Sequence, residues 1–387
     1  MSEKMTSINP QILVWCREVS GISFEEASKK FGTGKLSNWE SGDDFPTYNQ
    51  LQQLCDFYRK PIAICFFPEP PKYKSLSTSF RTIPSVIKST LLNRNTSRLV
   101  DEARVMQLNL YELNGHDNIA YSSFASYTFS QNLSIMVKEL RQLLNVSLSR
   151  QKQITSSSEH FEFWREKFSE LGVFVFKDAF GDDNISGFCL YDELFPIIYI
   201  NNSLSFTRQT FTLFHELCHI VFKTSGIDVL NDQAYHNSLA ASDLMIERTC
   251  NAFAGAFLVP DEDFQKQIQG KHPSEEFVSH LATVYGVSRE VILRKFLDIH
   301  WISLEEYIER SSEYTQDYFR IQKASSKKDA GGNYYNTQAS YKGRQYTELV
   351  FNRYYANRIT LAQAAQYMNM KIPSIRAFAE KKGWGSI

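Results

Sequence analysis

Long apolar runs are absent from this sequence of 387 residues. None approaches the roughly 18 residues that a membrane-spanning helix needs, and residues 1–9 lack the apolar core of a signal peptide. The six cysteines include no C-x-x-C pair, and they mostly lie among apolar neighbours, which is typical of reduced, buried thiols. We therefore expect a cytoplasmic protein with no membrane partner.

Net charge is also nearly absent, because 42 Lys and Arg residues are balanced by 43 Asp and Glu residues. The molecule as a whole thus has no bulk attraction for nucleic acid. The charges are distributed unevenly: residues 1–70 carry 7 Lys and Arg against 9 Asp and Glu, whereas residues 311–387 carry 12 against 5. Since contacts with phosphate need Lys and Arg, the basic C-terminal region is the better candidate for binding DNA or an acidic partner.

The pattern of apolar residues predicts a mainly helical α+β protein with four regions. These regions are a helix-turn-helix bundle (1–70), a linker with a helical connector (71–155), a central domain (156–310) and a basic helical C-terminal region (311–387), which resembles a helix-turn-helix in part. Three apolar runs, at residues 173–176, 187–191 and 195–200, predict the strands of a small sheet in the central domain.

The stretch HELCH, residues 215–219, is the strongest chemical motif in the chain. Residues four apart lie on one face of a helix, so His215 and His219 can bind one metal ion. Glu216 then lies beside the open coordination position, where it can accept a proton from a metal-bound water. The motif therefore predicts two metal ligands and a general base. The alternative, two histidines that bind nothing, is disfavoured because the motif follows a predicted strand and lies within an apolar helix.

A catalytic zinc site usually has three protein ligands, so a third must come from elsewhere in the chain. We favour Glu247, which lies in an otherwise apolar helix predicted over residues 242–259. The small residues of this helix, Ala252, Ala254, Gly255 and Ala256, should let it approach the HELCH helix closely. His236, in a loop rich in Asp and Asn, is the rival ligand. Two His and one Glu suit Zn²⁺ well.

Substrate binding is less clearly marked in the sequence. The strand predicted at residues 195–200 is a candidate for the edge of the sheet, where an extended peptide substrate could pair with it. Candidates for transition-state donors are Tyr235, His236 and Arg208, and each also has a structural or solvent-exposed interpretation.

Two segments, residues 23–32 and 360–369, share the outline of a helix-turn-helix. Each has a capping residue, a reciprocal Glu or Gln, a small residue and a turn former at the same offsets. A generic helical hairpin also satisfies this outline, especially in the second copy. Because its turn is tight and its net charge negative, the first copy is expected to bind a partner protein or the rest of this chain, or to bind DNA only weakly.

Several segments together resemble ImmA/IrrE-type metallopeptidases with an N-terminal XRE-like helix-turn-helix module. The most specific are ISGFCLYDELFPIIYINN, RQTFTLFHELCHIVF and ERTCNAFAGAFLVP; SFEEASKKFGTGKLSNWESGDDFPTYNQLQQLCDFYRKPIAICFFPEPP resembles the module. The resemblance implies a zincin-like peptidase domain, a zinc-dependent endopeptidase, and a protein substrate that is often a transcriptional repressor in stress response. It implies metal-ligand roles for His215, His219 and Glu247, and the base role for Glu216.

The sequence departs from the family at Cys218, where the family most often has Gly, and in the first helix-turn-helix turn, which is two residues shorter than usual. A second function therefore competes with the first: a regulator of transcription that binds DNA or a partner, with a structural or sensory metal and no cleavage. Cys218 or Cys250 could then complete the metal's ligands. Glu216 favours the enzyme, because a purely structural site does not need a carboxylate between its histidines.

Overall fold

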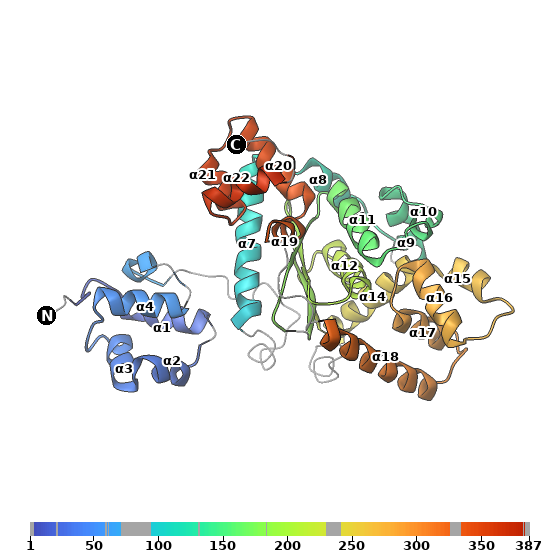
Figure 1. Ribbon diagram of the computed structural model, residues 1–387, viewed down its shortest axis with the longest axis horizontal. Coiled ribbons are helices and arrows are strands. Elements are labelled where there is room, and N and C mark those ends of the chain that lie inside the picture. Colours follow the sequence, from blue (N-terminus) through green and yellow to red (C-terminus); the bar gives the residue numbers. More distant parts are fainter. Residues whose placement is uncertain are drawn as a thin grey trace. The chain divides into compact units, whose positions relative to one another are not determined.

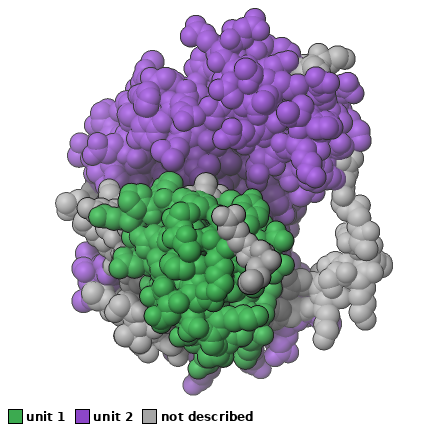
Figure 2. Space-filling model, turned by 90° about the vertical axis from the view of Figure 1, so that its left-hand side faces the viewer, with its two compact units in different colours: residues 1–102 green, residues 103–387 purple. Residues whose placement is uncertain are grey.

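The computed structural model describes residues 4–20, 22–58, 60, 62–70, 94–130, 132–182, 184–229, 241–325, 334–381 and 383, and Figure 1 labels its helices and strands. The predicted linkers therefore fall largely outside the described residues, as do Tyr235 and His236. The chain forms two compact units, residues 1–102 and residues 103–387 (Figure 2). No helix among the residues described has both the length and the apolar character to cross a membrane.

The first unit is a group of short helices, two of which begin at a capping side chain. Asn9 caps α1 and Pro10 begins it, and the Ser23 hydroxyl accepts a hydrogen bond from the Glu26 amide at the start of α2. Gly32 alone, with a φ of 90°, joins α2 to α3, so the turn is as tight as predicted. The elements are α1 (Pro10–Val19), α2 (Phe24–Phe31), α3 (Thr33–Ser41), α4 (Tyr48–Tyr58) and the 3-10 helix η1 (Ile62–Phe66).

The second unit combines many helices with one small sheet, which confirms the mainly helical α+β fold. Helix α7 (Arg94–Asn114) leads into it from the first unit. The elements that precede the metal-motif helix are α8 (Ile119–Ala125), α9 (Leu133–Leu143), α10 (Leu148–Lys152), α11 (Ser157–Glu170), β1 (Phe174–Asp178), β2 (Ile185–Leu190) and β3 (Ile197–Asn201). The metal-motif helix and those that follow are α12 (Phe206–Val221), β4 (Ile227–Val229), α14 (Ala241–Leu258), α15 (Asp261–Ile268), α16 (Glu275–Tyr285), α17 (Arg289–Asp298), α18 (Leu304–Ser325), α19 (Tyr334–Lys342), α20 (Arg344–Tyr355), α21 (Leu361–Tyr367) and α22 (Ile372–Lys381).

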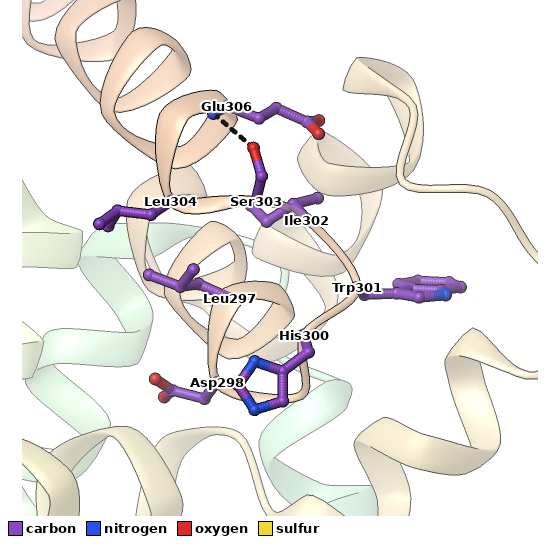
Figure 3. A pocket seen from close by; sticks show the side chains of 8 residues that line it. All are labelled: Leu297, Asp298, His300, Trp301, Ile302, Ser303, Leu304 and Glu306. Atoms are coloured by element: carbon purple, nitrogen blue, oxygen red, sulfur yellow. Dashed lines mark hydrogen bonds between the residues drawn. The ribbon is translucent and has the colours of Figure 1, made fainter.

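A surface pocket lies at the corner between α17 and α18 (Figure 3). Its lining comes from the end of α17, the connecting turn and the first turn of α18. Ser303 caps α18 there, because its hydroxyl accepts a hydrogen bond from the Glu306 amide at 3.1 Å. None of the predicted site residues lines this pocket, so it is a corner between two helices and plays no part in the predicted chemistry.

The four strands run in the order β1-β3-β2-β4. Strand β3 pairs in parallel with β1 and antiparallel with β2, and β2 pairs antiparallel with β4. The three predicted strands are therefore present, and β4 is an additional one. The prediction that the strand ending at Asn201 forms an edge of the sheet is wrong, because β3 has a partner on each side. The edges of the described sheet are β1 and β4.

Both faces of the sheet are covered by other elements. On one face, Val175, Ile198 and Cys189 belong to the same buried cluster as α11 and α12. On the other, the rings of Phe176, Tyr199 and Phe188 lie beside one another, and Tyr346 of α20 packs edge-on against Phe176 with ring centroids 5.3 Å apart. Burial on two faces explains why the strands read as continuous apolar runs.

Arg165, a buried residue of α11, joins the C-terminal helices to this sheet. Its Nε and Nη2 donate to the carbonyl of Val175 in β1, at 3.0 and 2.7 Å. Its Nη1 donates to the carbonyl of Ser340 in α19 at 2.6 Å. Residues 334–381 thus pack against the sheet within the second unit, and the domain boundary expected near residue 311 lies inside α18.

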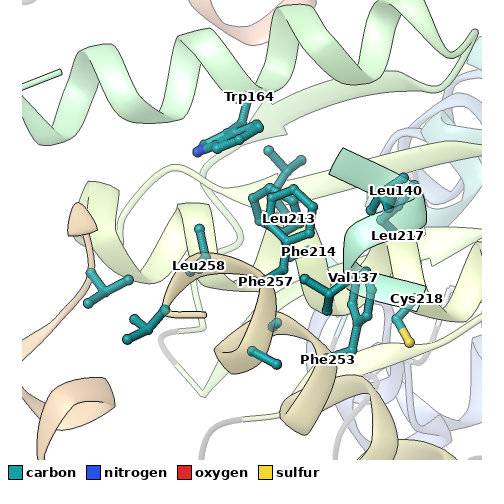
Figure 4. Packing of buried hydrophobic residues seen from close by; sticks show 14 of the residues in the cluster. Val137, Leu140, Trp164, Leu213, Phe214, Leu217, Cys218, Phe253, Phe257 and Leu258 are labelled. Carbon is teal, nitrogen blue, oxygen red and sulfur yellow. The ribbon is translucent and has the colours of Figure 1, made fainter. Parts of the chain in front are cut away.

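Helices α12 and α14 pack tightly against each other, and this contact positions the metal motif. The rings of Phe214 and Phe257 stack with centroids 4.3 Å apart, and Trp164 packs edge-on against both (Figure 4). Of the four small residues expected to allow the approach, Ala254 and Ala256 are buried, but Ala252 is exposed and Gly255 faces open space. The close contact therefore depends on large stacked rings as much as on small side chains.

Candidate metal centre

Three buried side chains from two helices converge between α12 and α14. His215 and His219 come from α12, and Glu247 comes from α14. The two Nε2 atoms lie 3.1 Å apart, and the Glu247 carboxylate oxygens lie 3.2 Å from His215 Nε2 and 3.5 Å from His219 Nε2. Glu247 is only 3% exposed, which is unusual for a helical carboxylate and agrees with a role inside a site.

These separations fit a zinc ion. A tetrahedral zinc with ligand bonds of about 2.0–2.1 Å places neighbouring ligand atoms about 3.3 Å apart. The three distances between the donor atoms bracket that value. Within the described part of the chain, the potential ligand atoms that cluster this closely come from His215, His219 and Glu247. Cys218 and Cys250 are buried nearby but do not join this group, which weakens the interpretation that a thiol completes the ligands.

The outer nitrogen of each imidazole is held by a polar side chain. His215 Nδ1 lies 3.1 Å from Asn251 Oδ1, one turn along α14 from Glu247. His219 Nδ1 lies 3.2 Å from the Thr224 hydroxyl, and that hydroxyl donates its own proton to the His219 carbonyl. Both partners therefore accept from Nδ1–H, which leaves each Nε2 lone pair directed at the metal position.

Gly226 lies directly against the second histidine. A Cβ atom at this position would be 2.7 Å from Cδ2 and Nε2 of His219, closer than non-bonded atoms approach. Gly187 of β2 has a similar role beneath α12, where a Cβ atom would be 2.6 Å from the Thr212 methyl group. These two glycines let the sheet and the segment after α12 approach the metal-motif helix closely.

Residues 168–297 match the family model of the IrrE N-terminal-like domain, Peptidase_M78. The resemblance of this region to an ImmA/IrrE-type metallopeptidase is thereby confirmed. The match includes every residue of the centre described above, and it extends neither to the N-terminal module nor to the helices from α18 onward. Among curated proteins, no match to this chain is found. The chain therefore contains a metallopeptidase-like region, while the helix-turn-helix resemblance stays a prediction.

Asp228 forms an ion pair with Arg208 and interacts electrostatically with His215, the first histidine of the motif. Asp228 of β4 accepts hydrogen bonds from Arg208 Nη2, at 3.0 and 3.1 Å, and from the Thr212 hydroxyl at 2.8 Å. Burial opposes the ionisation of Asp228, but the Arg208 guanidinium and His215 outweigh it and lower its pKa. Arg208, a candidate transition-state donor, thus binds Asp228 and the Ser186 hydroxyl, which is a supporting role.

The ionisable side chains of the centre shift one another's pKa values. Burial opposes the protonation of His215, yet the carboxylates of Asp228 and Glu247 raise its pKa well above the ordinary value. Burial likewise opposes the ionisation of Glu247, but hydrogen bonds from His215 and His219 lower its pKa well below the usual range. Without a metal, the site therefore favours positive charge between the two helices, which is the charge that a divalent cation supplies.

Glu216 of the M78-like region differs from its neighbours. Its side chain is fully buried, and no N–H or O–H group among the described residues donates to its carboxylate oxygens; the only donor there that interacts with them is the weakly polar thiol of Cys189. Burial raises the pKa of Glu216 to about 7, although the two imidazoles lower it in part. A carboxyl group with a pKa near neutrality can both accept and release a proton at physiological pH.

Three predicted ligands lie together, and Glu216 shares the helix of two of them. Thr224, Gly226 and Asp228 were missed, although all three contact or stabilise the ligands. They occur in the short stretch TSGID, which has too little periodicity to predict a strand. Its only signal was the grouping of small and polar residues directly after the motif helix.

Proposed function

We propose that the protein is a zinc-dependent endopeptidase that cleaves a regulatory protein, in particular a transcriptional repressor. His215, His219 and Glu247 hold the zinc ion, and Glu216 is the general base. The match to a metallopeptidase family and the spacing of the three donors support this assignment. The choice of a repressor as substrate depends on the family resemblance.

Glu216 provides the single observation on which the proposal depends. Burying a polar group without a partner costs about 1–3 kcal/mol, and a charged carboxylate costs more. A fold that keeps such a group beside three converging ligands bears this cost for a chemical reason. A structural or sensory metal site would need no such carboxylate, so the regulator without cleavage is the weaker alternative.

Each residue then has a defined task in peptide hydrolysis. When bound, zinc lowers the pKa of a coordinated water to about 7 and polarises the substrate carbonyl. Glu216 accepts a proton from the attacking water and transfers it to the departing amine. Asn251 and Thr224 keep the imidazoles in the tautomer that leaves Nε2 free, and the carboxylate of Asp228 favours positive charge at the centre.

Replacement of Glu216 by glutamine tests this mechanism. Glutamine preserves the size of the side chain but cannot accept the proton. We therefore expect zinc content to be retained and cleavage of a repressor from a neighbouring gene, co-expressed with this protein, to fall by at least about 100-fold. Metal content is measured by elemental analysis and cleavage by mass spectrometry of the substrate fragments. His215→Gln is the matched control that should lose both zinc and cleavage. Equal cleavage by Glu216→Gln and the wild-type protein would remove Glu216 from the mechanism.

A further inference from the structure

The last three helices form a helix-turn-helix. The Thr360 hydroxyl accepts from the Gln363 amide and the Gln363 side chain accepts from the Thr360 amide, so a capping box begins α21. Asn369, with a φ of 53°, reverses the chain after α21, and the Lys371 carbonyl accepts the first hydrogen bonds of α22. Four residues, 368–371, therefore separate the two helices, as in a short helix-turn-helix turn.

This module is held rigidly within the second unit. Phe351 of α20 stacks on Phe378 of α22 with ring centroids 6.1 Å apart and planes within 10°. Tyr346 donates to the Tyr367 carbonyl at 3.0 Å, and the Tyr367 hydroxyl donates to Glu112 of α7 at 2.7 Å. Packing and hydrogen bonds thus fix the orientation of the exposed face of α22.

The exposed face of the module is basic. Residues 334–381 contain 7 Lys and Arg against 2 Asp and Glu. One of these two acids, Glu348, is bonded to Arg344. Arg358, Lys371 and Arg376 are exposed, and none of the three forms an ion pair with a described residue. Arg376 lies on α22, Lys371 directly precedes it, and Arg358 precedes the cap of α21, so the cations flank both helices of the motif.

The N-terminal helices share the motif but not the charge. On α2 and α3, Lys29, Lys30 and Lys35 are exposed, but Glu25 and Glu26 are exposed on the same helices and the region 1–70 is net acidic. The helix-turn-helix outline therefore occurs twice in the chain, and only the second copy has an excess of Lys and Arg over Asp and Glu. Because contacts with phosphate need cations, the C-terminal copy is the better candidate for binding DNA.

We propose that the module α20–α22 binds double-stranded DNA, with α22 in the major groove and Arg358, Lys371 and Arg376 at phosphates or base edges. Helix α22 has 10 residues. The diameter of an α-helix with its side chains, about 10–12 Å, fits a major groove about 12 Å wide. The peptidase centre takes no part in this binding, so the inference is independent of the proposed function.

Binding is measured with the full chain by fluorescence anisotropy, with a labelled 30-bp duplex of random sequence as the probe, at about 50 mM salt. The double variant Lys371→Gln, Arg376→Gln should bind at least about tenfold more weakly. Its salt dependence, the slope of log affinity against log salt, should decrease by about 2. Matched controls are Lys266→Gln, Lys271→Gln, which removes two exposed charges elsewhere, and Lys29→Gln, Lys35→Gln in the N-terminal copy. Both controls should bind as the wild-type protein does.

Three results would overturn the proposal. The first is the absence of duplex binding by the wild-type protein. The second is loss of binding in the N-terminal double variant with retention in the C-terminal one. The third is equal affinity for polyglutamate and for the duplex, which would identify a site for an acidic protein. All the substituted residues are exposed, so we expect every variant to fold. Thermal unfolding of each variant checks this.

Discussion

At the scale of single residues, two glycines of the M78-like region have opposite surroundings. Gly226 lies against the ring of His219, whereas a Cβ atom at Gly255 would have no neighbour within 4 Å. The difference makes the pair a direct test of whether the segment after α12 positions a metal ligand.

Gly226→Ala should displace the His219 ring and weaken zinc binding by about 10–100-fold, the usual effect of disturbing a residue that orients a ligand. Gly255→Ala should leave zinc affinity unchanged and stabilise α14 by up to about 1 kcal/mol, because alanine favours helix. Zinc affinity is measured by competition with a chromophoric chelator. Equal affinities in the two variants would show that the close contact does not constrain His219.

Lys177 gives a second prediction at this scale, through the pH dependence of stability. The residue is buried on β1, with its ammonium nitrogen 4.5 Å from the centroid of the Phe161 ring. Burial, with a contribution from Arg165, lowers its pKa from 10.5 to about 8. Between these two values the unfolded chain holds a proton that the folded chain has released, so the free energy of unfolding rises with pH in this window.

Lys177→Met should increase the free energy of unfolding at neutral pH by up to about 3 kcal/mol and should lack the rise above about pH 8. Urea unfolding of the variant and the wild-type protein is compared at several pH values, so that the ionisation of tyrosines cancels in the difference. Lys271→Met, at an exposed position, is the control. A wild-type protein that loses stability relative to Lys177→Met as the pH rises from about 8 to 10 would contradict the burial argument.

At the scale of secondary-structure elements, the metal centre depends on the packing of α12 against α14. The stacked rings of Phe214 and Phe257 are both fully buried at this interface. The ligands lie on the same two helices, so a change in helix spacing alters the distances between the donor atoms as well as the stability of the fold.

Phe257→Ala should reduce the free energy of unfolding by about 3–5 kcal/mol, because it leaves a cavity between the helices. We also expect weaker zinc binding, since α14 can then move relative to α12. Met245→Ala on the same helix is the control, because Met245 is 71% exposed and its loss should change neither quantity. Chemical denaturation and zinc competition measure the two effects, and unchanged stability of Phe257→Ala would show that the stack carries little of the packing energy.

Several of these elements could be predicted from sequence for physical reasons. The helices that carry His215 and Glu247 are long and largely apolar, so both were predicted, and the second was placed within one residue of its observed ends. Strand β4 has only three residues, too few for any alternation to be recognised. The apolar run that forms β3 was assigned to an edge, although consecutive apolar residues are typical of a strand that is buried on both faces.

The residues of the metal centre also differ in how far the sequence could predict them. His215, Glu216 and His219 follow from local spacing, and Glu247 follows from its apolar surroundings in the sequence. Thr224 and Asp228 contact the centre only through the fold, because the chain must reverse after α12 and enter β4 before they reach it. The C-terminal helices were expected as a separate region, and their contacts with β1 depend on residues more than 150 positions apart, such as Arg165 and Ser340.

At the scale of the whole molecule, the chain has two compact units with separate buried cores. The proposed zinc ligands all belong to the second unit, so a chelator should lower the unfolding temperature of that unit and leave the first unit unaffected. At a free zinc concentration about 1,000-fold above the dissociation constant, the metal should contribute about 4 kcal/mol.

Differential scanning calorimetry with and without a chelator measures this effect, and added zinc should restore the higher transition. Glu247→Gln is the control, because it should lose most of the response to zinc. Equal shifts of both transitions on chelation would show that the two units do not unfold independently, and no shift at all would contradict the assignment of the ligands.

Arg165 gives the arrangement of the second unit a consequence during synthesis. One of its acceptors, the Ser340 carbonyl, lies 175 residues further along the chain, and Tyr346 completes one face of the sheet. While residues 334–381 are still inside the ribosome, a buried guanidinium and a row of aromatic rings have no cover. This face of the sheet is therefore covered only after residues 334–346 have been synthesised, long after β1 itself has emerged.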